Sequence, residues 1–283
     1  MNPHRPFEHS GLLTLIALSA LSPGWGIAAA KQTTAGALLS TVPALPTQAQ
    51  AAYALWTDEG GDLKAGPAFK SVAEAIQSAT AQAQSLRLDA APSAQPSHAA
   101  TRPVSSQEQT LLGHIGTYPG GAAVQQAIQS AHNAQTALEQ RWKQQIQALE
   151  RQENQARSAL APCRGETGEP SQTAIRDLAL RFADQKIALA DRYLPQFASL
   201  ADQLRAAVGP RIEFGDSAMS AWRQLGNPAS SRQLAGIAAA AQSNAYADVG
   251  LVNLFVESVS KQGARAIADK KTVLRIYANA RGC

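Results

Sequence analysis

The two cysteines are the residues of this chain whose chemistry is easiest to interpret. Cys163 lies in a short segment rich in proline and glycine, and Cys283 ends the sequence. Paired cysteines form disulfides in oxidising compartments, whereas a lone thiolate acts as a nucleophile or a metal ligand. Because the chain opens with residues typical of an export signal, we predict a Cys163–Cys283 disulfide. The alternative is a bridge between two chains through Cys283.

The histidines give no pattern typical of a metal site. Beyond residue 30 they are His98, His114 and His132, and none has a partner at a spacing such as His-x3-His or Cys-x2-Cys. A glycine-rich stretch at residues 113–121 matches neither the Walker loop nor the dinucleotide fingerprint. We therefore predict no metal and no other cofactor, and a structural role for the glycine-rich stretch.

The acidic residues do not form a convincing catalytic pair. Two pairs fall in predicted turns, where their charges are solvated: Asp58 with Glu59, and Glu166 with Glu169. Acid–base catalysis instead needs carboxylates held in a cleft. No Gly-x-Ser-x-Gly elbow is present. The sequence thus predicts a protein that is not an enzyme, and an enzyme acting on the cell wall is the least favoured hypothesis.

Trp142 is the aromatic residue that we single out for binding. It lies between Arg141 and Lys143 on a long predicted helix, so the three residues form a possible partner-binding surface. Aromatic residues at helical spacing more often belong to a core, and that is the competing interpretation.

The elements that position these residues are two long stretches of apolar periodicity, residues 121–160 and 171–208. Apolar residues recur in both at spacings of three and four, which predicts helices with one buried face. The breaker at residues 161–170 contains two prolines and two glycines, and a connector this short predicts an antiparallel hairpin. Pro195 predicts a kink near Leu194, and Gly209-Pro210 predicts the end of the second helix.

The rest of the carboxyl-terminal half is also predicted to be helical. Asp216 is a candidate cap for a short helix, and Asn227-Pro228 is a candidate start for the next one. The apolar residues from Leu251 onwards continue towards Cys283 at helical spacing. We therefore expect a third long element that packs on the hairpin.

The amino-terminal third divides by composition. Residues 1–30 resemble a signal peptide with cleavage after Ala30, and an uncleaved anchor is the alternative. Residues 31–50 are predicted to be a flexible lead-in. Residues 51–89 are predicted to form a small strand–strand–helix module whose helix starts at Ser71, with Glu74 completing a capping box. Residues 90–105 are predicted to be a linker rich in Pro, Ala and Ser, which leaves 106–283 as the helical domain.

Charge and composition narrow the possible partners. The formal net charge is +4, with Lys and Arg interleaved among Asp and Glu, and this pattern does not suggest nucleic-acid binding. After the signal no apolar run is long enough to span a bilayer. Aromatic residues make up only 5% of the chain, so we expect a core built largely from Ala, Leu, Ile and Val on helical faces.

Together these patterns predict a mainly α fold: an elongated antiparallel helical bundle built on the long hairpin. In composition alone the chain resembles helical exported components of bacterial secretion or conjugation systems. That resemblance implies a periplasmic or secreted, non-enzymatic scaffold or interaction protein whose partners are envelope or secretion-apparatus proteins, with a homo-oligomer possible. The alternative function is a periplasmic chaperone or inhibitor that binds clients between its helices.

Overall fold

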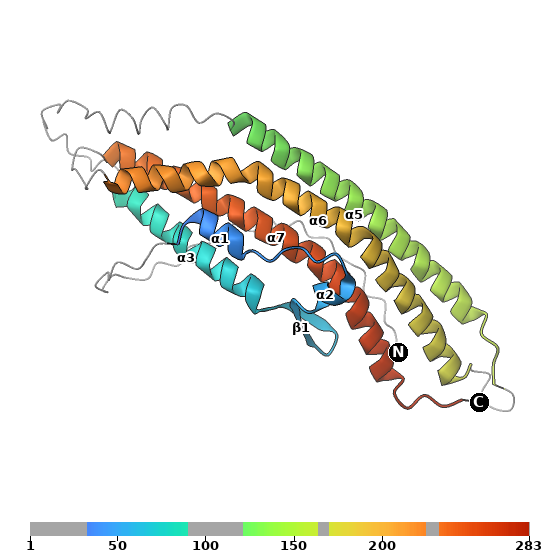
Figure 1. The fold of residues 1–283 in the computed structure, drawn as a ribbon. Coiled ribbons are helices and arrows are strands. Elements are labelled where there is room, and N and C mark those ends of the chain that lie inside the picture. Colours follow the sequence, from blue (N-terminus) through green and yellow to red (C-terminus); the bar gives the residue numbers. More distant parts are fainter. Residues whose placement is uncertain (1–32, 90–120, 164–169, 225–231, 283) are drawn as a thin grey trace, which may run out of the picture. The chain divides into compact units, whose positions relative to one another are not determined.

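The structure is a computed structural model, and it describes residues 33–89, 121–163, 170–224 and 232–282 (Figure 1). It is mostly helical (82%), with six helices packing against each other and one two-stranded antiparallel sheet in the described part. The predicted fold class is therefore confirmed. The predicted signal peptide, the linker and the glycine-rich stretch up to Gly120 lie outside the described residues. No helix of the described part is long and apolar enough to cross a membrane.

Three long helices form the body of the fold. They are α5 (Gly121–Ser158), α6 (Gln172–Gln224) and α7 (Arg232–Ile276). Helix α6 lies between α5 and α7 (Figure 1). With 53 residues, α6 is about 80 Å long at ~1.5 Å per residue. The predicted third long element is thus α7, and it packs on the second helix of the hairpin.

Helix α6 does not end at Gly209-Pro210, so that prediction was wrong. Both Pro195 and Pro210 lie inside the helix, on its exposed side. An interior proline costs about 3 kcal/mol. On the opposite side Val208 and Ile212 are at most 2% exposed, and burying such side chains contributes about 1.5–3 kcal/mol each. Tertiary packing on both sides of Pro210 therefore offsets the local stop signal.

The lead-in was predicted to be flexible, but its described part is folded onto the bundle. Residues 33–53, here called the N-terminal segment, contain α1 (Ala35–Thr41) and α2 (Ala49–Tyr53). Both helices contact α6 and α7. The side chains of the segment that face the bundle are at most 5% exposed: Ala35, Leu38, Val42, Leu45, Ala49 and Ala52.

The predicted strand–strand–helix order is confirmed for residues 56–89. Strands β1 (Trp56–Glu59) and β2 (Asp62–Ala65) pair antiparallel, and the two-residue turn Gly60-Gly61 has positive φ at both positions, as a tight hairpin requires. Helix α3 (Pro67–Asp89) follows. It begins at Pro67, so Ser71 is not an N-cap: its hydroxyl donates to the carbonyl of Ala68 inside the helix.

One hydrophobic core joins all of these elements. It draws buried side chains from both strands and from every helix of the described part. Two glycines bring α6 and α7 close together: a Cβ on Gly215 would lie 2.7 Å from the carbonyl oxygen of Ala241, and one on Gly263 would lie 2.9 Å from Leu194. The amino-terminal elements therefore share the core of the helical bundle.

Candidate functional site

Trp142, which was predicted to form a partner-binding surface with Arg141 and Lys143, is buried in the contact between two long helices. Its side chain is only 4% exposed. It stacks on Tyr193 with ring centroids 5.9 Å apart, and it lies 5.7 Å from the ring of Phe197. Arg141 and Lys143 are exposed on either side. The tryptophan instead fixes the contact between α5 and α6.

The outer side of that contact carries a groove. A hollow of ≈ 550 Å³ is lined by α6 alone, and an adjoining hollow of ≈ 370 Å³ is lined by α5 and α6; the two share Gln185 and Ala188. We call them together the hairpin groove. Its lining residues from α5 are Gln145, Ala148, Leu149 and Gln152, and those from α6 are Asp177, Leu180, Arg181, Asp184, Gln185, Ala188, Leu189 and Arg192.

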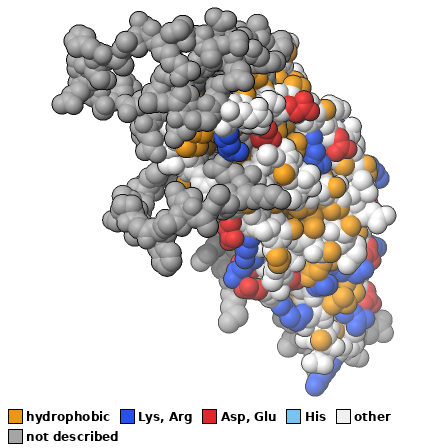
Figure 2. All heavy atoms as spheres, turned by 60° about the vertical axis from the view of Figure 1, so that its left-hand side comes forward, with side chains coloured by type: hydrophobic (Ala, Val, Ile, Leu, Met, Phe, Trp, Pro, Cys, Tyr) orange, Lys and Arg blue, Asp and Glu red, His pale blue; other side chains and the backbone are white. Residues whose placement is uncertain are grey.

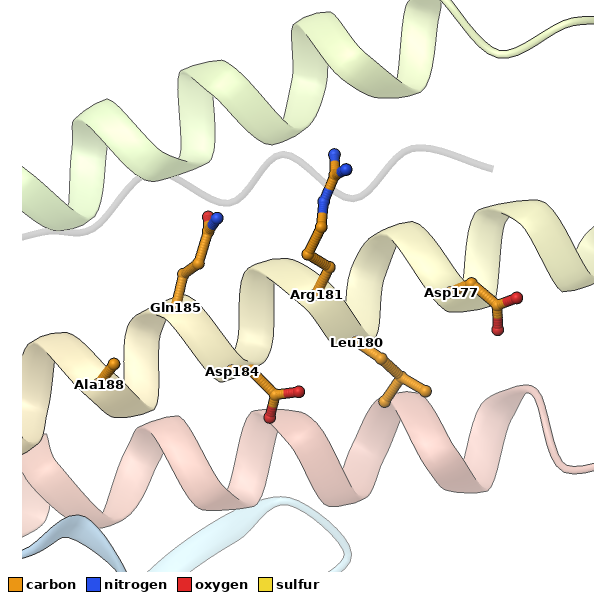
Figure 3. A pocket seen from close by; sticks show the side chains of 6 residues that line it. All are labelled: Asp177, Leu180, Arg181, Asp184, Gln185 and Ala188. Carbon is orange, nitrogen blue, oxygen red and sulfur yellow. The ribbon is translucent and has the colours of Figure 1, made fainter.

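Figure 3 shows how the α6 side chains lie. Arg181 and Gln185 point towards α5, while Leu180 and Asp184 point towards α7. The carboxylate of Asp184 accepts a hydrogen bond from Lys270 of α7 at 2.6 Å. Because Ala188 has a small, exposed side chain, the middle of the groove is open to a partner's side chains.

Charges of both signs surround this region. Lys186 of α6 lies 3.5 Å from Glu153 of α5, so an ion pair links the two helices beside the groove. Nearby on α7, burial raises the pKa of Asp269, although Arg265 and Lys186 act in the opposite direction. Figure 2 shows one face of the molecule, on which Lys and Arg alternate with Asp and Glu around hydrophobic side chains. The groove itself is lined by Asp177, Asp184, Arg181 and Arg192, so it suits a partner with mixed charge.

A second cluster fastens the N-terminal segment to the bundle. One oxygen of Asp216 accepts from the amide of Ala35 and the other from the amide of Gly36, both at 2.8 Å. Gln242 of α7 also donates to Asp216 at 2.8 Å. The hydroxyl of Tyr246 donates to the carbonyl of Thr33 at 2.9 Å, and burial raises the pKa of this tyrosine.

Two more α6 side chains extend this fastening. The guanidinium of Arg205 donates to the carbonyl of Pro43 at 2.6 Å, and Asp191 accepts from the amide of Ala49 at 2.7 Å. A helix leaves the backbone groups at its two ends without partners inside the helix. Side chains of the bundle bind such groups at the ends of α1 and α2. Asp216 was predicted to cap a helix of its own, but it lies inside α6 and binds the start of α1 instead.

The β-hairpin is fixed to the far end of α7. Asp58 accepts hydrogen bonds from the Tyr53 hydroxyl and the Gly61 amide, both at 2.7 Å, and these bonds lower the pKa of Asp58. Arg275 donates to the carbonyl of Gly60 at 2.9 Å. Asp58 therefore stabilises the turn, which gives this carboxylate a structural role.

The tip of the long hairpin lies beside the end of the chain. Pro162 and Pro170 form an isolated β-bridge, and the amide of Thr173 donates to the carbonyl of Arg281 at 3.3 Å. The described part contains no free cysteine. Cys283 itself lies outside the described residues, so the Cys163–Cys283 disulfide stays a prediction.

Only one of the three histidines considered above lies in the described part of the chain. His98 and His114 lie outside the described residues, and His132 is exposed on α5. Within the described ranges, no group of three or more His, Cys, Asp or Glu residues is placed to hold a metal ion.

The described part is thus a mainly helical bundle that carries a surface groove. Comparisons with protein-family models, with curated proteins and with solved structures found no match.

Proposed function

We propose that the protein is an exported helical scaffold or interaction protein, a subunit of a bacterial envelope, secretion or conjugation assembly. In this proposal it acts by binding, and the hairpin groove receives a helix of an envelope partner. The observation that carries the proposal is the groove itself, which continues from α6 onto α5.

The shape and the charges of the groove favour a helical partner. Two neighbouring helices leave a furrow into which the ridges of a third helix fit. Ala148 and Ala188 permit close approach, while Leu149 and Leu180 supply apolar contact. The basic Arg181 and the acidic residues of the groove call for a partner that carries both charges.

Site-specific photocrosslinking in the cell tests this proposal. A photoreactive residue in place of Gln185 should give a defined adduct with an envelope protein, whereas the same residue at Gln77, exposed on α3, should not. The variant Ala188→Trp, which fills the groove, should abolish the adduct. If the adduct persists in that variant, or if Gln185 yields none, the groove is not the binding surface.

Export is the second part of the proposal and needs its own test. Protein recovered from the periplasm should begin at Lys31 when its amino terminus is sequenced. A protein found only in the cytoplasm, with residues 1–30 intact, would contradict the export proposal and leave the groove proposal to be judged separately.

A periplasmic chaperone or inhibitor is the second candidate function. The observation in its favour is the leucines that line the groove, since an apolar lining also suits unfolded segments of client proteins. This candidate predicts that the protein suppresses the aggregation of a reduced, unfolding client in a turbidity assay, and that Ala188→Trp removes the effect.

A further inference from the structure

The bundle holds the N-terminal segment by its backbone. Four side chains of α6 and α7 make these bonds: Asp191, Arg205, Asp216 and Tyr246. The groups that they bind are the amides of Ala35, Gly36 and Ala49 and the carbonyls of Thr33, Val42 and Pro43. Main-chain hydrogen bonds give affinity for the path of a chain and leave the choice of sequence to the side-chain contacts. We call these four residues, together with Asn253 of α7, the α6–α7 seat.

Asn253 brings an unused acceptor to the seat. Its side chain is buried, at 3% exposed, and the side-chain oxygen has no hydrogen-bond partner among the described residues. At about 100° per residue, positions seven apart lie on the same side of a helix, so Asn253 is in line with Tyr246 and Ser260. Tyr246 binds Thr33. Ser260 accepts a hydrogen bond from Trp56 at 3.2 Å. This side of α7 therefore faces the amino-terminal elements, and their packing leaves unpaired an acceptor of a kind that is normally paired when buried.

The packing of α6 against α7 places Asn253 level with Arg205. A Cβ on Gly263 of α7 would lie 2.9 Å from Leu194 of α6, and the two helices are antiparallel (Figure 1). Asn253 lies ten residues before Gly263, and Arg205 lies eleven residues after Leu194. At this level Arg205 donates to the carbonyl of Pro43 at 2.6 Å. Because proline has no amide N–H, Pro43 has no donor to offer Asn253.

We infer that the α6–α7 seat is a peptide-binding site, that the N-terminal segment is its resident occupant, and that a segment of a partner protein displaces this resident. The partner's segment starts a short helix at Asp216 and carries apolar side chains where the resident has Leu38 and Val42. It differs from the resident in having an amide N–H where the resident has Pro43. Such a chain satisfies both Arg205 and Asn253, whereas Pro43 satisfies Arg205 alone.

The tether to its own chain favours the resident. A short link keeps a binding segment at a high effective concentration beside its site. A partner in solution therefore displaces the resident only if its segment binds more tightly, and the hydrogen bond to Asn253 supplies that difference. The seat shares no residue with the hairpin groove, so this inference is independent of the proposed function.

Fluorescence anisotropy with labelled synthetic peptides of residues 33–53 tests the inference. The receptor is the full chain with Leu38→Glu, which places a charge at a position 4% exposed and so releases the resident without changing the seat. The peptide should bind this receptor at least tenfold more tightly than it binds the unaltered chain, and adding Asp216→Ala to the receptor should remove the gain. Ser40→Glu, at an exposed position of α1, is the matched control and should bind the peptide as the unaltered chain does.

A peptide with Pro43→Ala separates a partner site from a seat made only for the resident. Losing a proline makes the free peptide more flexible, which by itself weakens binding. We expect the opposite, roughly fivefold tighter binding than with the native peptide, because the new amide donates to Asn253. Asn253→Leu in the receptor should abolish this gain.

Two results would overturn the inference. A native peptide that binds as tightly as Pro43→Ala would show that the seat is matched to its own segment, which a second copy could also supply. A receptor that binds neither peptide while circular dichroism shows its helices intact would show that the seat takes no free segment. If Leu38→Glu loses its helices, Gly36→Asp serves as the receptor, since a Cβ at Gly36 would lie 3.2 Å from a carboxylate oxygen of Asp216 and a second carboxylate there repels it.

Discussion

Replacing Asp216 with alanine should detach the N-terminal segment from the bundle while the long helices stay folded. The carboxylate accepts three hydrogen bonds at 2.8 Å, from the amides of Ala35 and Gly36 and from Gln242. Ala35 is fully buried and Gln242 is 4% exposed, so neither donor can readily turn to water. Gly36 is exposed, and its amide can bind water after the substitution.

The expected cost follows from these two buried donors. A buried donor left without a partner costs about 1–3 kcal/mol, so with two such donors the docked state of the segment should lose about 2–6 kcal/mol. Every 1.4 kcal/mol is a factor of ten in an equilibrium constant. The undocked population should therefore rise by roughly 30- to 20,000-fold.

Hydrogen exchange read by mass spectrometry measures this change directly. Peptides from residues 33–46 should lose protection by roughly the factor given above, while peptides from the middle of α6 and α7 should keep theirs. The matched control is Asp177→Ala, on the same helix, whose side chain is 64% exposed. It should leave the protection of both sets of peptides unchanged. Unchanged protection of residues 33–46 in Asp216→Ala would contradict this prediction, as would an equal loss of protection in all helices.

Three further predictions follow from other contacts. The pKa of Tyr246 is raised in the folded chain, so as the pH rises the unfolded chain loses the tyrosine proton first. The free energy of unfolding should therefore fall as the pH rises above the ordinary tyrosine pKa of 10.0. Urea titrations at several pH values measure this fall, and the part due to Tyr246 should be absent in Tyr246→Phe. Trp142→Ala should lower the free energy of unfolding by about 3–5 kcal/mol, whereas Lys143→Ala should change it by less than about 0.5 kcal/mol. Thiol titration of protein from the periplasm should find Cys163 and Cys283 oxidised within one chain. On the chain-entropy model, reducing this disulfide should lower the free energy of unfolding by about 5 kcal/mol. An oxidised dimer on a non-reducing gel would favour the bridge between chains.

The apolar period of the sequence predicted the long helices well because it reports directly on a buried face. The first helix was predicted over residues 121–160, and α5 covers Gly121–Ser158. The same pattern placed Trp142 among the apolar residues of its helix, and the structure buries it there. Its two charged neighbours suggested an exposed site, but adjacent residues on a helix point about 100° apart, so they say nothing of the face that Trp142 occupies.

Local stop and start signals predicted the ends of helices less well. Pro210 and Ser71 each have a strong local preference, and in each case the helix continues past the predicted boundary. A proline or a capping residue changes the free energy by about 1–3 kcal/mol, which is comparable to the burial of one or two side chains. Whether the signal prevails therefore depends on what the next turn of helix buries, and that is set by residues far away in the sequence.

The fastening of the N-terminal segment shows this limit most clearly. Thr33–Tyr53 is rich in Ala, Thr, Pro and Gln, a composition that predicts mobility, and on its own the segment buries too little to fold. It folds because Asp216, 181 positions after Ala35, accepts its backbone amides, and because the apolar surface of α6 and α7 receives its small side chains. No local pattern around Asp216 distinguishes it from the exposed carboxylates of the same helix. The backbone amides at the starts of α1 and α2 need acceptors, and a carboxylate on the bundle can supply one. The structure identifies that carboxylate for α1 as Asp216.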